Sequence, residues 1–99
     1  MLPVEVFAGA TEQADAAVVY LEQRSPRTAD RFRQILRETL QKLGQFPHLG
    51  IESRYGTRLL ILPKFRYRIF YLVKAEHITV IGIYHPAQST HDLFDRLHE

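Results

Sequence analysis

A very short link between two helical patterns is the feature that most limits how this chain folds. The segment 12–24 carries small and aliphatic residues at helical spacing, which form one apolar stripe: Ala14, Ala17, Val18 and Leu21. Thr11 suits the N-cap of this helix. Ser25 and Pro26 suit the start of the next, because proline loses no hydrogen bond at the first helical position. Helices joined so closely fold back on each other, so the sequence predicts an antiparallel helical hairpin.

The second helical pattern begins at Pro26 and has a long apolar face. Its apolar residues recur every three or four positions: Ala29, Phe32, Leu36, Leu40 (or Thr39) and Leu43. Gly44 follows the last of them, in the position where a left-handed glycine ends many helices. We therefore expect the second helix to end at Gly44.

Strand-like segments lie on both sides of the hairpin. Residues 4–8 alternate apolar with polar side chains, and three more candidates follow a loop over 45–56: 58–62, 65–74 and 77–84. The polar tail 89–99 is expected to add one or two helical turns, capped by Ser89 or Thr90. The order β-α-α-β-β-β predicts one α+β domain over residues 1–99, with the helical hairpin on one face of a mainly antiparallel sheet.

Composition excludes several classes of protein. The chain has no cysteine, so it can form neither a disulfide nor a thiolate metal site, and we expect a cytoplasmic setting. Its histidines lack the spacing of metal ligands, and no glycine-rich phosphate loop is present. We read no signal peptide, and no apolar run approaches the ~20 residues that span a bilayer. We expect no metal, no cofactor and no membrane partner.

Positive charge is concentrated in one stretch of the chain. The net charge is only +2, but residues 53–75 hold six basic residues and no acidic one: Arg54, Arg58, Lys64, Arg66, Arg68 and Lys74. Such asymmetry within one domain indicates a surface for a polyanion or an acidic partner. The alternative is a solvated sheet face opposite mildly acidic helices, and the charge pattern alone leaves both readings open.

Strand alternation assigns the side chains of 65–74 to two faces. One set is apolar or aromatic and should face the helices: Phe65, Tyr67, Ile69, Tyr71 and Val73. The other set begins with Arg66 and Arg68 and should be open at that end. If residues 75–76 form a two-residue turn, Arg68 lies opposite Ile83, and Arg66 lies opposite His85 on the open face. The face of Arg58 depends on the turn at 63–64.

The sequence therefore proposes a basic patch that comprises Arg58, Lys64, Arg66, Arg68 and His85. Arginine forks match phosphate oxygens, and a histidine among arginines keeps its neutral form, which suits a general base. These groups are the parts for holding RNA and activating a 2′-hydroxyl, with Arg66, Arg68 and His85 as catalytic residues. The alternative is that His85 only ends a strand before a proline.

Several motifs together resemble the RelE/ParE superfamily of toxins from type II toxin–antitoxin systems. They are the helix start "SPRTADRFRQIL", the helix exit "FPHLG", and the strands "YRIFYLV" and "HITVIGIYH", and in this order they cover nearly the whole chain. The resemblance implies the β-α-α-β-β-β fold. It also implies a toxin neutralised by a cognate antitoxin, a segment of which crosses the helical hairpin and the sheet edge.

The superfamily divides by target, and the resemblance favours the ParE-like, plasmid-stabilisation branch, which poisons DNA gyrase. The segment "RYRIFYLV", followed by His85 at the end of the last strand, is more similar to that branch. Two positions depart from the family patterns. Gln88 stands where the ParE branch often carries arginine, and "HPAQST" lacks the tyrosine or basic group that the nuclease branch often carries there.

Three functions stay open from the sequence. The first is a ParE-like toxin that acts on gyrase, and the second is a RelE-like, ribosome-dependent endoribonuclease that cleaves mRNA with Arg66, Arg68 and His85. The third is a non-toxic relative that only binds the antitoxin.

Overall fold

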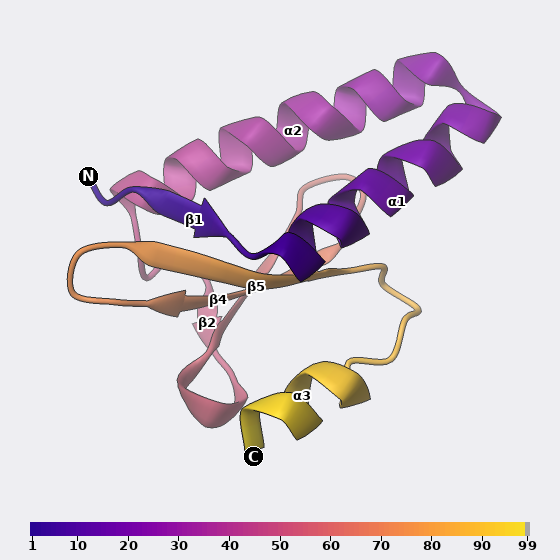
Figure 1. The fold of residues 1–99 in the computed structure, drawn as a ribbon. Helices are drawn as coiled ribbons and strands as arrows, with labels where there is room; N and C mark the ends of the chain where they lie inside the picture. The colour runs from indigo at the N-terminus through magenta and orange to yellow at the C-terminus, as the bar shows by residue number, and fades with distance from the viewer. Residues whose placement is uncertain (99) are drawn as a thin grey trace.

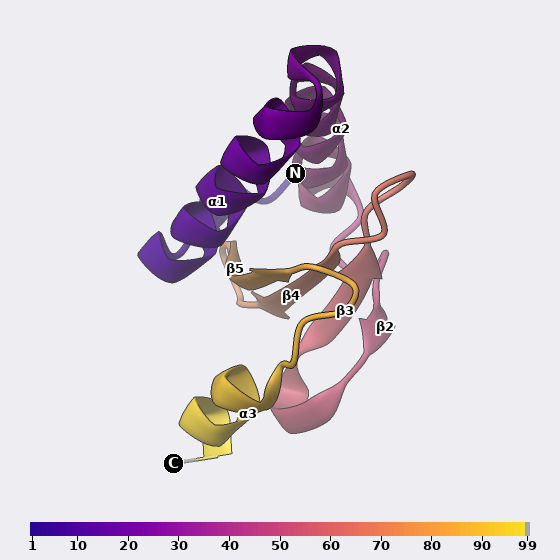
Figure 2. The ribbon, with the colours of Figure 1, turned by 90° about the vertical axis from the view of Figure 1, so that its right-hand side faces the viewer.

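The computed structural model describes residues 1–98 as two helical layers on opposite faces of one five-stranded sheet. Its elements, in chain order, are β1 (Val4–Val6), α1 (Ala8–Arg24), α2 (Pro26–Gln45), β2 (Ile51–Glu52), the short 3₁₀ turn η1 (Arg54–Gly56), β3 (Arg58–Ile61), β4 (Arg68–Val73), β5 (Ile78–Tyr84) and α3 (His91–His98). Figure 2 shows the hairpin of α1 and α2 on one side of the sheet and α3 on the other. The predicted α+β class is confirmed, and the strand β2 lies inside the segment predicted as a loop.

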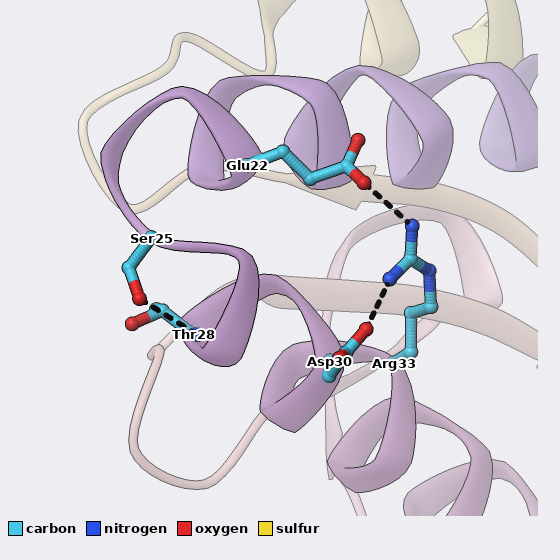
Figure 3. Close-up of polar contacts among 5 residues, drawn as sticks. All are labelled: Glu22, Ser25, Thr28, Asp30 and Arg33. Carbon is cyan, nitrogen blue, oxygen red and sulfur yellow. Dashed lines mark hydrogen bonds and ion pairs between the residues drawn. The ribbon is translucent and has the colours of Figure 1, made fainter.

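The helical hairpin forms where the sequence predicts it (Figure 1). Ser25 caps α2, because its Oγ accepts a hydrogen bond from the backbone N of Thr28 at 3.3 Å, and Pro26 opens the helix (Figure 3). The first helix starts earlier than predicted, at Ala8 instead of after Thr11. The predicted buried face of α2 was partly wrong, since Ile35 is buried there while Leu36 is only half-buried. Of the two alternatives at the next turn, Thr39 is buried and Leu40 is half-buried.

The prediction that the second helix ends at Gly44 is wrong. The helix continues through Gln45, and Gly44 is buried inside its last turn. The backbone N of Leu2 donates to the carbonyl oxygen of Gly44 at 2.9 Å. A Cβ at Gly44 would lie 2.8 Å from the carbonyl oxygen of Leu2, so glycine lets the N-terminal segment approach the helix.

The sheet has the strand order β1-β5-β4-β3-β2, in which β1 and β5 are parallel and the other neighbouring strands are antiparallel. On the hairpin side, the core includes the side chains that alternation assigned to that face: Tyr67, Ile69 and Tyr71, with Phe65 and Val73 at its margin. On the other side, a smaller cluster packs under α3: Phe70, Ile81, Tyr84 and Leu93. The prediction of which residues face the helices is confirmed.

A β-bulge in the pairing of β4 with β5 shifts the predicted register by one residue. Phe70 pairs with Gly82 and Tyr71 pairs with Val80, so Ile81 has no partner across the ladder. Arg68 consequently lies opposite Tyr84, and its predicted pairing with Ile83 is wrong. The predicted pairing of Arg66 with His85 is also wrong, because β4 begins at Arg68 and Arg66 belongs to the preceding turn.

Candidate functional site

Arg58 holds the loop after α2. It lies opposite Tyr71, on the hairpin side of the sheet, and its Nε donates to the carbonyl oxygen of Gly50 at 3.0 Å. The hydroxyl of Tyr71 fixes the same loop, because it donates to the carbonyl oxygen of Pro47 at 2.8 Å and accepts from the backbone N of Gly50 at 2.9 Å. Glu52 lies 3.8 Å from the Arg58 guanidinium. The guanidinium of Arg58 therefore stabilises the loop after α2.

Arg68 holds the turn after β5. Its Nη2 donates to the carbonyl oxygen of His85 at 3.1 Å and to that of Gln88. Its Nε is buried and finds no hydrogen-bond partner within residues 1–98. Arg68 thus directs its charge at backbone carbonyls of 85–88, which fixes the path of the chain from the sheet toward α3.

Lys64 and Arg66 differ from these two arginines, because both are exposed in the β3–β4 turn (residues 62–67). Both have left-handed backbones, with φ of 69° and 61°. The turn is closed by hydrogen bonds from the N of Leu62 to the O of Tyr67, at 2.8 Å, and from the N of Arg66 to the O of Leu62, at 2.9 Å. Each left-handed residue of this kind costs about 1 kcal/mol.

Phe65 packs the β3–β4 turn against α2. Its ring packs edge-on against Phe32 at a centroid distance of 5.2 Å, and it borders a hollow of about 420 Å³ that Arg27 and Arg31 also line. Figure 2 shows the turn rising beside α2. Arg27 and Arg31 line this hollow with Phe65, and Lys64 and Arg66 flank Phe65 in the turn. We call these four residues the cationic cluster: Arg27, Arg31, Lys64 and Arg66.

His85 lies on the hairpin side of the sheet, away from the predicted open face. Its ring packs edge-on against Tyr67 at 5.3 Å and against Tyr20 at 6.5 Å. Its Nδ1 accepts a hydrogen bond from the backbone N of Ala87 at 3.0 Å, so a neutral ring carries its proton on Nε2. Burial, and then the nearby Tyr20, raise the pKa of Tyr67 above its ordinary value. The bulge at Ile81 explains this placement, because one extra residue exchanges the faces beyond it.

A groove runs along the helical hairpin between α1 and α2. The groove has a volume of about 580 Å³, and the sequence assigned most of its apolar lining to the core: Ala14, Val18, Phe32, Leu36 and Leu40. Val19 also lines it and was not so assigned. Only Phe32 of these is fully buried. At the rim, Arg33 joins the two helices, because it contacts Glu22 at 3.2 Å and Asp30 at 2.7 Å (Figure 3).

Sequence reasoning identified two members of the cationic cluster and missed the other two. The structure keeps Lys64 and Arg66 together, but it directs Arg58 and Arg68 at backbone carbonyls in two different loops. Arg27 and Arg31 were not predicted as site residues. Their spacing of four residues on a predicted helix was the available signal, since it places both side chains on one face. Over residues 1–98, no set of three potential metal ligands comes together, and no helix is long and apolar enough to cross a membrane.

The fold and these surfaces define a class of small α+β protein with a helical hairpin over a twisted sheet. Among solved structures, the chain resembles one described as "Chromosomal ParDE TA system from P. aeruginosa". The match has a TM-score of 0.72 at 23% identity, and it covers 86% of this chain and 96% of the other. No curated protein matches the chain.

A family model described as "ParE toxin of type II toxin-antitoxin system, parDE" matches residues 4–90. The chain therefore belongs to the ParE toxin family. It is a type II toxin, and its partner is a cognate antitoxin.

Proposed function

We propose that this toxin acts by binding DNA gyrase and carries out no RNA cleavage. Gyrase is the target that the resemblance to the ParE branch implies. The observation that carries the proposal is that the three residues that a nuclease would use have three different surroundings. Arg68 is bonded to the backbone of 85–88, Arg66 stands in the β3–β4 turn, and His85 packs against tyrosines on the hairpin side.

Cleavage beside a 2′-hydroxyl needs a base and cations around one phosphate. The base must reach the hydroxyl within about 3 Å, and the cations must face the charge that develops on the phosphate. Here the His85 ring is engaged at Nδ1 and lies between α1 and the sheet, while its carbonyl oxygen is what faces Arg68. A toxin that works by binding alone does not need these groups to meet.

The test is a supercoiling assay with purified gyrase, relaxed plasmid and ATP. We expect the toxin to inhibit supercoiling and the cognate antitoxin to restore it. The same toxin preparation should bind the antitoxin in a parallel titration, which shows that it is folded. Full supercoiling in the presence of a toxin that binds its antitoxin would contradict the proposal.

We also propose that the antitoxin places an amphipathic helix in the groove between α1 and α2. The groove combines a half-buried apolar floor with a rim of both charge signs, from Asp15 and Glu22 to Arg33 and Arg37. A helix that inserts apolar residues every three or four positions fits such a groove. Val19 is the natural probe, because its side chain lines the groove and is 54% exposed.

Val19→Glu adds a charge to the groove without disturbing the core. We expect it to weaken antitoxin binding at least tenfold, or about 1.4 kcal/mol, in isothermal titration calorimetry. Thr11→Glu is the matched control, because it adds the same charge at an exposed position of the same helix. Equal antitoxin affinity for the two variants would place the antitoxin elsewhere.

A further inference from the structure

We propose that the cationic cluster of Arg27, Arg31, Lys64 and Arg66 binds the phosphodiester backbone of a nucleic acid. This inference goes beyond the proposed action on gyrase and can be tested without that enzyme. It concerns a surface distinct from the hairpin groove and from the carbonyl-bound arginines.

Within residues 1–98, the charges of the cluster are not neutralised by acidic side chains. Among residues 1–98, none of its four members forms an ion pair, and the one side-chain hydrogen bond is that of Arg31 to Gln34, at 3.4 Å. Asp30 borders the same hollow, but its carboxylate is bonded to Arg33 at 2.7 Å. The cluster therefore presents a net positive field to an incoming ligand.

The β3–β4 turn presents its cations on a fixed backbone. Three backbone hydrogen bonds hold the turn, and Phe65 and Tyr67 both pack edge-on against the buried Phe32, at 5.2 and 5.1 Å. A ligand that binds to a backbone already in place costs less ordering entropy than one that must fix a mobile loop. Three of the four cations are arginines, whose planar forks match the oxygens of a phosphate.

The cluster lies on a different face of α2 from the groove. Arg33 lines the groove, whereas Arg27 lines the hollow beside the β3–β4 turn. Six residues rotate a helix by about 600°, so these two side chains point about 120° apart. The same rotation separates Arg31 from Arg37. An antitoxin helix in the groove thus leaves the cationic cluster open, which argues against the antitoxin as its ligand.

The experiment measures fluorescence anisotropy of labelled 20-base-pair duplex DNA and of a 20-nucleotide single-stranded RNA, titrated with the toxin at several salt concentrations. The key variant is Lys64→Gly with Arg66→Gly. Glycine accepts the left-handed backbone of both positions, so this variant keeps the turn while it removes two charges. The control is Lys42→Gln with Arg96→Gln, which removes two exposed charges elsewhere.

We expect the wild type and the control to bind with equal affinity and the glycine variant to bind roughly tenfold more weakly at low salt. For duplex DNA, the slope of log affinity against log salt should fall in magnitude by about 1.8, and by about 1.4 for the single strand. Which probe binds more tightly identifies the type of nucleic acid.

Three results would overturn the inference. The first is equal affinity of the glycine variant and the control, and the second is no binding of either nucleic acid at low salt. The third is tighter binding of a poly-glutamate peptide than of both nucleic acids, which would make the ligand an acidic protein segment.

Discussion

The arginines on the strands and the cations in the β3–β4 turn come from one short basic stretch, yet they meet different surroundings. Arg58 and Arg68 donate to backbone carbonyls of the chain itself. Lys64 and Arg66 stand exposed in a tight turn, on left-handed backbones. The first pair stabilises two different loops, 48–50 and 85–88, and the second pair remains available to a ligand.

The difference shows that a run of basic residues is not by itself a binding surface. On a strand, a guanidinium beside an irregular loop finds carbonyls that lack a partner, and it satisfies them. In a tight turn, the backbone groups already bond to each other, so the side chains have no carbonyl to satisfy. Whether an arginine is available to a ligand therefore depends on whether backbone carbonyls nearby lack a hydrogen-bond partner. Three predictions test this contrast, and a fourth tests the burial of Tyr67.

The largest effect is expected in the loop that Arg58 shares with Tyr71. Tyr71→Phe removes two hydrogen bonds and leaves the N of Gly50 without its partner, so the free energy of unfolding should fall by about 2 kcal/mol in urea denaturation. Tyr20→Phe is the control, since Tyr20 is 44% exposed and should lose less than about 0.5 kcal/mol. Similar losses of stability in both variants would show that the loop after α2 does not depend on the hydroxyl of Tyr71.

The next effect separates the two kinds of basic residue directly. Arg68→Lys keeps the charge but loses the planar guanidinium whose Nη2 donates to two carbonyls, so we expect the free energy of unfolding to fall by about 1 kcal/mol. Arg66→Lys, the same change in the turn, should leave stability within about 0.5 kcal/mol of the wild type. If Arg66→Lys were the more destabilising, the contrast would be reversed.

A smaller effect of opposite sign is expected at the turn. Lys64→Gly and Arg66→Gly should each raise the free energy of unfolding by about 0.5 kcal/mol, because relief of the left-handed backbone exceeds the added entropy of the unfolded chain. Thermal unfolding of the two single variants measures this. A loss above about 1 kcal/mol in either variant would mean that the replaced side chain stabilises the turn and is not free to bind a ligand.

The smallest effect concerns pH and the buried phenol of Tyr67, whose ring packs against His85. Burial raises the pKa of Tyr67, so at high pH the unfolded chain loses the phenol proton before the folded chain does. This contribution to stability is complete below about pH 10 and is lost as pH rises through the raised pKa. Urea denaturation at pH 8 and pH 11 should show a smaller fall for Tyr67→Phe than for the wild type. An equal fall would show that Tyr67 ionises alike in both states.

The sequence predicted the fold class, the helical hairpin and the faces of β4, because each depends on local periodicity. Ser25 and Pro26 mark the start of α2, and alternation from Phe65 to Val73 identifies the side chains that face the helices. These signals need no knowledge of distant residues. Sequence resemblance then gave the toxin family, which the match over residues 4–90 supports.

The site was predicted less well, because it depends on register and on contacts between distant segments. The bulge at Ile81 exchanges the face of His85, and a one-residue shift of this kind alters no periodicity in β4. Gly82, isolated inside a strand pattern, was the signal that could have indicated a bulge. The carbonyls that Arg58 and Arg68 bind belong to loops 8 and 17–20 residues away, which no local pattern identifies.

The most direct test of the account is a map of mRNA 5′ ends in a bacterial host shortly after the toxin is induced without its antitoxin. Arg68 is bonded to the backbone carbonyls of 85–88 and the His85 ring packs against tyrosines on the hairpin side, so we predict growth arrest with intact messages. New 5′ ends at consistent positions within translated codons would contradict the account, because they would show that these residues assemble a nuclease on the ribosome.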